Sequence, residues 1–161
     1  MPFTPFHVGP VLLIYGILVF LDPIALIYGS VLVDLEPVIV MFFLRVGTLH
    51  GPAHSIVGVM LLLPLIYVAT LITRRLFPLA DSIFIPKGKK FTYQTTVLSI
   101  LIGVYSHLIL DSFLYPELNL VWPLPYWNPL LHQVSDVLVY DLCMVALVFG
   151  FLLVLLRGLK R

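Results

Sequence analysis

Residues 55–73 read SIVGVMLLLPLIYVATLIT and contain no charged side chain. A helix needs about 20 consecutive apolar residues, with a range of about 17–25, to cross the hydrocarbon core of a bilayer. This stretch therefore predicts a transmembrane helix. Residues 97–115 and residues 137–156 meet the same criterion, although each of them contains ionisable side chains.

The composition of the whole chain agrees with a membrane protein. Of its 161 residues, 61% are hydrophobic and 11% are charged, whereas soluble domains carry about 25% charged residues. A water-soluble protein of this size has no core that buries so much apolar surface. The net charge of +1 indicates no nucleic-acid partner, and the only cysteine, Cys143, leaves no disulfide framework. We predict an all-α fold in which residues 1–161 form one polytopic transmembrane bundle of four to five helices in the cell membrane.

The first 45 residues are harder to assign. Residues 8–21 form a short apolar run, and residues 24–44 are apolar except for Asp34 and Glu36. We predict a short helix, a tight turn, and a second helix that is broken near Glu36, because the residue before a proline avoids helical backbone. These two helices form a hairpin that either spans a thinned bilayer or re-enters on the same side, and both alternatives stay open.

The basic residues predict an orientation. Five of the nine Lys and Arg residues lie in residues 74–90, three lie in residues 157–161, and the ninth is Arg45. Because cytoplasmic loops carry an excess of Lys and Arg, we place both basic segments in the cytoplasm. If the first two helices both span, the N-terminus is outside. The loop at residues 116–133 is rich in aromatic residues and resembles an interfacial belt, with a substrate cage as the alternative.

This orientation brings ionisable residues from distant parts of the sequence to the outer side of the membrane. His50 and His54 are spaced i,i+4, as are His107 and Asp111, and on a helix such pairs share a face. A carboxylate inside a membrane helix costs about 2.5–3.5 kcal/mol on insertion scales, which a divalent cation offsets. Mixed His and carboxylate ligands suit Zn²⁺ first, with Mn²⁺ or Fe²⁺ as alternatives, and the set is large enough for two ions. The predicted metal ligands are His7, Asp34, His50, His54, His107 and Asp111.

Three further ionisable residues lie near the last apolar run. His132 and Asp136 form another i,i+4 pair, which we interpret as a loop residue and a helix N-cap. Asp141 lies inside the run, about one turn deeper. It is predicted either to support a metal ligand or to pair with a tyrosine.

Five short motifs follow one another over residues 4–125. They read TPFH at residues 4–7, VDLEP at 33–37, LHGPAHS at 49–55, SHLILDS at 106–112 and WPL at 122–124. In this order they resemble the YdjM-like membrane-bound metal-dependent hydrolases, most closely an archaeal-type branch of that family. Bacterial relatives usually have two Asp residues where this chain has Asp34 and Glu36, and a His-to-His run one residue longer than His50–His54. The resemblance implies a membrane-bound, metal-dependent hydrolase.

Two functions fit these observations. The first is a membrane metallohydrolase that acts on a lipid or another phosphoester at the outer side, with Glu36 or Asp111 as general base. The metal would lower the pKa of a bound water to about 7. The second is a non-enzymatic metal-binding transporter or scaffold, because intramembrane ionisable residues also mark ion pathways. The inner halves of residues 55–73 and 137–156 are almost purely apolar, which favours the hydrolase.

Overall fold

The computed structural model describes residues 5–45, 47–78, 85 and 89–159, and over these residues it is helical and contains no strand. The predicted all-α fold is therefore confirmed. The described α-helices are α1 (Pro5–Ile17), α2 (Pro23–Val31), α3 (Leu35–Ile39), α4 (Ile56–Leu76), α6 (Tyr93–Leu114) and α7 (Asp136–Leu159). Three short turns complete the described helical structure: η1 (Leu32–Asp34), η2 (Val40–Leu44) and η3 (Pro52–His54).

Within the described residues, four segments are long and apolar enough to cross a membrane: Pro23–Leu44, α4, α6 and Asp136–Arg157 within α7. They correspond to the predicted spans 24–44, 55–73, 97–115 and 137–156. The predicted helix at residues 8–21 is instead α1, which has 13 residues. At 1.5 Å per residue α1 is about 20 Å long, which is shorter than the hydrocarbon core of about 30 Å. The part of the chain that the structure describes thus contains four candidate spans and one shorter apolar helix outside them.

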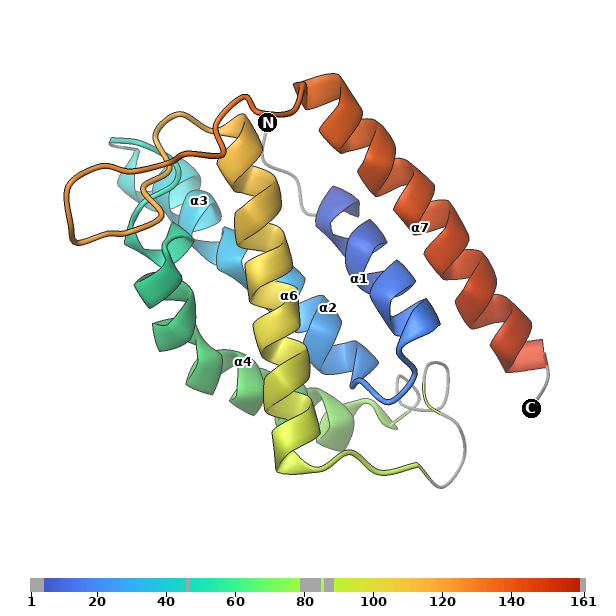
Figure 1. Cartoon of the computed structure of the whole chain (residues 1–161). Helices are drawn as coiled ribbons and strands as arrows, with labels where there is room; N and C mark the ends of the chain where they lie inside the picture. Colours follow the sequence, from blue (N-terminus) through green and yellow to red (C-terminus); the bar gives the residue numbers. More distant parts are fainter. Residues whose placement is uncertain (1–4, 46, 79–84, 86–88, 160–161) are drawn as a thin grey trace.

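The first two helices form a hairpin inside the bundle. Figure 1 shows α7 beside α1 on one side of this hairpin, and α6 with α4 on the other side. The backbones of α2 and α6 meet closely, because a Cβ on Gly29 would lie 2.6 Å from the Ile100 carbonyl oxygen. A Cβ on Gly103 would lie 2.5 Å from the Leu26 carbonyl oxygen. Such contacts at small residues are typical of helices that pack within membranes.

The second span is broken, as predicted, but at η1 rather than at Glu36-Pro37. The α-helical hydrogen bonding of α2 changes to a 3₁₀ turn at Leu32–Asp34 and resumes in α3. Pro37 has no N–H for the Val33 carbonyl, and its ring crowds that carbonyl. The disturbance therefore falls one turn before the proline. The 3₁₀ turn ends at Asp34, whose side chain is buried in the bundle.

The described basic residues of the two predicted cytoplasmic segments lie at one end of the bundle. Side chains there join α4 to the residue before α2, α7 to the end of α1, and Lys89 to the turn between α1 and α2. The contacts are Arg74 Nη2 to Asp22 Oδ2 at 2.7 Å, Arg157 Nη1 to the Tyr15 carbonyl oxygen at 3.4 Å, and Lys89 Nζ to the Val19 carbonyl oxygen. Lys87, Lys160 and Arg161 lie outside the described residues.

Candidate metal centre

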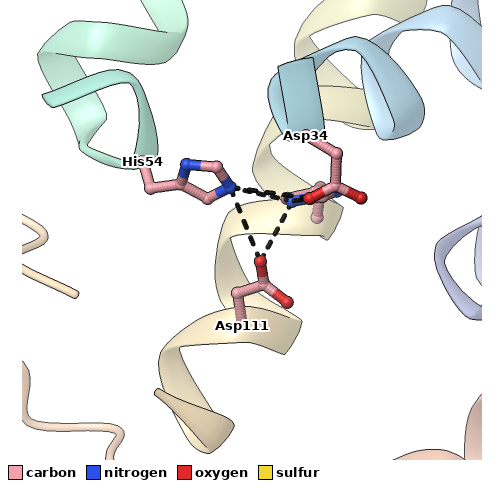
Figure 2. A group of neighbouring side chains, drawn as sticks. Asp34, His54 and Asp111 are labelled. Atoms are coloured by element: carbon pink, nitrogen blue, oxygen red, sulfur yellow. Dashed lines mark hydrogen bonds and ion pairs between the residues drawn. The ribbon is translucent and has the colours of Figure 1, made fainter. Parts of the chain in front are cut away.

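Four buried side chains meet near the opposite end of the bundle, where α4 begins and α6 ends. Asp34 comes from η1, His54 from η3, and His107 and Asp111 from α6. One potential ligand atom of each lies within 4.8 Å of the other three. Figure 2 shows the side chains of Asp34, His54 and Asp111 pointing toward one another from three separate helical segments. Their relative exposures are between 0% and 5%, so water does not solvate the group.

The distances within this group suit a single divalent ion. His107 Nε2 lies 3.1 Å from Asp111 Oδ2, 3.4 Å from Asp34 Oδ1 and 3.3 Å from His54 Nε2. His54 Nε2 lies 3.7 Å from the same Asp111 oxygen and 3.8 Å from the same Asp34 oxygen. A tetrahedral ion with nitrogen and oxygen ligands at about 2.0–2.1 Å separates neighbouring ligand atoms by about 3.3 Å. The predicted proximity of His107 and Asp111 on one helix face is confirmed.

The other nitrogen of each imidazole is held by an acceptor. His54 Nδ1 lies 2.9 Å from Glu36 Oε2, and His107 Nδ1 lies 2.7 Å from the Ser30 carbonyl oxygen. An ionised carboxylate and a carbonyl only accept hydrogen bonds, so Nδ1 donates in both rings. When both rings are neutral, the Nε2 atom of each therefore carries a lone pair. Each lone pair faces the other ring and the carboxylates of Asp34 and Asp111. A cation at the centre would replace this repulsion with attraction, and the outer partners are of the kind that orient metal-binding histidines.

The pKa of His54 indicates the protonation state of the centre when no cation is bound. This residue lies before α4, outside the candidate spans. Burial lowers its pKa, but the carboxylates of Asp34, Glu36 and Asp111 outweigh burial and raise the pKa of His54 to about 9. A metal-free centre therefore holds a proton on His54 at neutral pH, and an incoming cation has to displace that proton.

His7 and His50 lie at the edge of the four-residue group. His7 Nε2 is 3.2 Å from Asp111 Oδ1, and its ring stacks on His107 with the centroids 4.0 Å apart. His50 Nε2 is 3.8 Å from Asp111 Oδ2, and His50 Nδ1 is 2.9 Å from Glu117 Oε1. All six predicted ligands are thus in one cluster. Four of them are close enough together to share an ion, and metal binding by His7 and His50 stays a prediction.

The loop that carries His50 and His54 differs from the prediction. The two residues do not share a helix face, because η3 begins after His50 and ends at His54. Their rings are nevertheless only 4.7 Å apart. Glu36 organises the loop, since its carboxylate accepts hydrogen bonds from the backbone N–H groups of Gly51 at 3.0 Å and Ala53 at 3.1 Å. A Cβ at Gly51 would lie 2.7 Å from Glu36 Oε1, so a larger residue there would displace this carboxylate.

Two outer partners were not predicted from the sequence. Glu117 contacts His50 across 67 residues of chain, and Ser30 contacts His107 across 77 residues through its backbone carbonyl. A backbone carbonyl has no sequence signal, and Glu117 follows Pro116 in what reads as an ordinary loop. Long-range contacts of this kind become visible only when the helices are packed.

The start of α7 requires a correction as well. Asp136 is the first residue of the helix, and the Ser135 hydroxyl accepts the Leu138 N–H at 3.3 Å, so Ser135 takes the capping role predicted for Asp136. His132 lies in the loop, as predicted, and its Nδ1 is 3.9 Å from Asp136 Oδ1, with both side chains exposed. Asp141 is exposed on α7 and is not part of the buried ligand group.

Comparisons of this chain with protein-family models, with curated proteins and with solved structures found no match. The resemblance to the YdjM-like hydrolases accordingly stays an expectation. The function has to be argued from the chemistry of the site, because a helical bundle alone indicates no activity.

Proposed function

We propose that this protein is a membrane-embedded, metal-dependent hydrolase that acts on a lipid phosphoester at the outer side of the cell membrane. The observation that supports the proposal is the buried group of Asp34, His54, His107 and Asp111, whose histidines are each oriented by a second acceptor. Zn²⁺ is the preferred ion for such ligands, with Mn²⁺ or Fe²⁺ as alternatives. When bound, it would polarise a phosphoryl oxygen and lower the pKa of a water molecule to about 7.

The contacts of the two predicted general bases separate their roles. Glu36 lies on the far side of His54 from the ligand group, and its oxygens accept hydrogen bonds from His54 and from the backbone of η3. These contacts support a positioning role for Glu36. Asp111 has Oδ2 toward the ligand group and Oδ1 toward His7. Of the two, Asp111 is therefore the one whose carboxylate would lie beside an ion bound in the ligand group.

A small hollow of about 10 Å³ lies beside His7, with room for one water molecule at most. It lies between α1, α6 and α7, and aromatic and aliphatic side chains form most of its wall. A lipid would therefore have to separate these helices before its phosphate could approach Asp111. Besides His7 and Tyr115, the lining residues are Phe6, Leu110, Leu114, Val139, Tyr140 and Cys143.

The proposal is tested with purified, metal-loaded protein in detergent and a panel of lipid phosphoesters. We expect hydrolysis of at least one of them, with loss of activity when a chelator is added or when His107 is replaced by Ala. Asp141→Asn is the matched control, because it removes a carboxylate from a membrane helix without touching the ligand group. Metal-loaded protein that hydrolyses no lipid phosphoester would contradict the proposal.

A non-enzymatic metal-binding protein is the second candidate. Four protein ligands around one Zn²⁺ close its coordination, which is typical of structural sites, whereas catalytic sites keep a position open. In that case the ion would stabilise the junction of η1, η3 and α6. His107→Ala would then lower the melting temperature, and no metal-dependent turnover would be found with any substrate.

A further inference from the structure

The segment between α6 and α7 contains a short run of exposed apolar residues. Residues 122–127 read WPLPYW and carry no charge. All six residues are exposed, and the exposed fractions of the four largest lie between 39% for Trp122 and 64% for Leu124. Contiguous apolar surface of this kind marks a contact with another protein or with a membrane. We call residues 122–127 the aromatic tip.

The backbone of the aromatic tip is closed around the side chain of Asn119. Asn119 Oδ1 accepts the N–H groups of Val121 at 3.3 Å and of Trp127 at 3.1 Å. Asn119 Nδ2 donates to the Leu124 carbonyl oxygen at 3.0 Å, and the Leu120 N–H donates to the Trp127 carbonyl oxygen at 3.2 Å. Because these polar groups already have partners within the segment, the tip can leave bulk water at little cost.

The residues on either side of the tip fasten it to the bundle. Leu118 and Leu120 are buried in the hydrophobic core, and the Leu120 carbonyl oxygen accepts the N–H of Ile56 in α4 at 2.9 Å. After the tip, Asn128 Nδ2 donates to the Ser112 carbonyl oxygen of α6 at 3.0 Å. Figure 1 shows the segment, in orange, reaching past the start of α4 on the side away from α7. The tip therefore has a fixed place at the metal-centre end of the bundle.

The flanking helices indicate where this place lies relative to a bilayer. Both α6 and Asp136–Arg157 of α7 are candidate spans, so the segment that joins them lies where these helices leave the hydrocarbon core. Trp and Tyr are enriched in this layer, because their rings are apolar while their N–H or O–H groups stay hydrated. A substrate cage would instead direct its rings at the ligand group, whereas the tip is exposed and the ligand group is buried.

We propose that the aromatic tip binds the membrane surface, with its rings in the lipid headgroup layer, and holds the metal-centre end of the bundle at that depth. The partner is the lipid interface itself. Because the tip carries no charge, zwitterionic phosphatidylcholine is a sufficient probe. The proposal rests neither on the hydrolase activity nor on which side of the membrane this end faces.

The test uses the intrinsic fluorescence of the chain, because its only two tryptophans, Trp122 and Trp127, both lie in the tip. The full chain is reconstituted into phosphatidylcholine vesicles that contain lipids brominated either near the carbonyl end or near the methyl end of their acyl chains. Trp122→Phe and Trp127→Phe each leave one reporter and keep an aromatic ring. We expect the shallow bromines to quench each reporter roughly twofold more than the deep bromines, because interfacial rings lie at headgroup level.

A tryptophan in the middle of a span is the matched control. Phe149 is exposed at 58% near the middle of α7. Phe149→Trp, made together with Trp122→Phe and Trp127→Phe, should be quenched more by the deep bromines than by the shallow ones.

Three results would overturn the proposal. The first is that dissolved iodide quenches Trp122 and Trp127 while neither brominated lipid does, because the tip then lies in water. The second is that the deep bromines quench them as strongly as they quench the Phe149→Trp control. The third is that both tryptophans are shielded from iodide and from both lipids, because protein then covers the tip.

Discussion

The sequence predicts Glu36 as a general base, whereas its contacts with His54 and with the backbone of η3 support a positioning role. This difference is testable. Glutamine keeps the shape of Glu36, and its carbonyl oxygen can still accept from His54 Nδ1 and from the Gly51 N–H, but it removes the negative charge beside His54. Its N–H₂ group would face the Ala53 N–H, which loses its acceptor, and His54 would become a less basic ligand. Glu36→Gln should therefore weaken metal binding by about 10–100-fold, the usual effect of losing such a partner.

A competition titration against a chelator measures this change. Gly51 and Ala53 donate to the same carboxylate, so circular dichroism should accompany the titration to show that the helices remain. If Glu36→Gln binds metal normally and loses only turnover, Glu36 is the general base predicted from the sequence and the positioning role is wrong.

The raised pKa of His54 predicts the pH dependence of metal binding. The pKa rises from 6.5 to about 9 in the metal-free fold. Protonation of His54 thus stabilises the metal-free protein below pH 6.5, and this contribution is lost as the pH rises through about 9. The cation competes with that proton, so metal affinity should rise with pH between about 7 and 9 and then level off. Calorimetric titration in buffers of different ionisation enthalpy counts the released protons, and a count of zero at pH 7 would contradict this account.

The candidate ligand residues could be found from the sequence because ionisable side chains stand out within apolar stretches that are long enough to span a membrane. Charged groups are rare in spanning helices, so Asp34 and Asp111 stand out, and the spacing of His107 from Asp111 places both on one helix face. No comparable signal marks Glu117 or the Ser30 carbonyl. Their contacts with His50 and His107 depend on tertiary packing over many residues.

At the scale of helices, the crossing of α2 and α6 sets the distance between Asp34 and His107. A Cβ at Gly103 would lie 2.5 Å from the Leu26 carbonyl oxygen, which is backbone and has to move with its helix. Gly103→Ala should therefore separate α2 from α6, lower the melting temperature and weaken metal binding. Gly16→Ala is the control, because the nearest atoms to its Cβ would be Leu153 side-chain atoms at 3.0 Å rather than a backbone oxygen at 2.5 Å.

Melting curves and metal titrations of the two alanine variants compare a backbone contact with a side-chain contact. Equal effects of Gly103→Ala and Gly16→Ala would show that the close approach of α2 and α6 does not position the ligands.

The candidate spans could be predicted from the sequence, because apolar length alone identifies a candidate membrane helix. The helical face predicted for His50 and His54 was wrong, because hydrogen bonds from Gly51 and Ala53 to Glu36 shape that loop instead.

At the scale of the whole molecule, the described basic residues of the two predicted cytoplasmic segments lie at one end of the bundle. The candidate metal ligands lie at the other end. Arg74 closes α4 at one end, and His54 precedes α4 at the other. The positive-inside rule then predicts that the metal centre lies toward the outside. In intact cells, a cysteine at Tyr126 should react with an impermeant thiol reagent, whereas a cysteine at Arg75 should react only after permeabilisation. Both positions are exposed, and the native Cys143 is buried. The reverse labelling pattern would contradict the orientation and the outward-facing site.

The central claim of this account is that the buried ligand group holds a divalent cation. Elemental analysis of the purified protein, with melting curves before and after chelation, tests it most directly. We predict roughly one equivalent of a divalent metal, as expected for one four-ligand site, and a lower melting temperature after the metal is removed. His107→Ala should lose both the metal and the effect of the chelator, because the remaining carboxylates lose their shared partner. Purified protein that contains no divalent metal, and whose melting the chelator leaves unchanged, would contradict the claim.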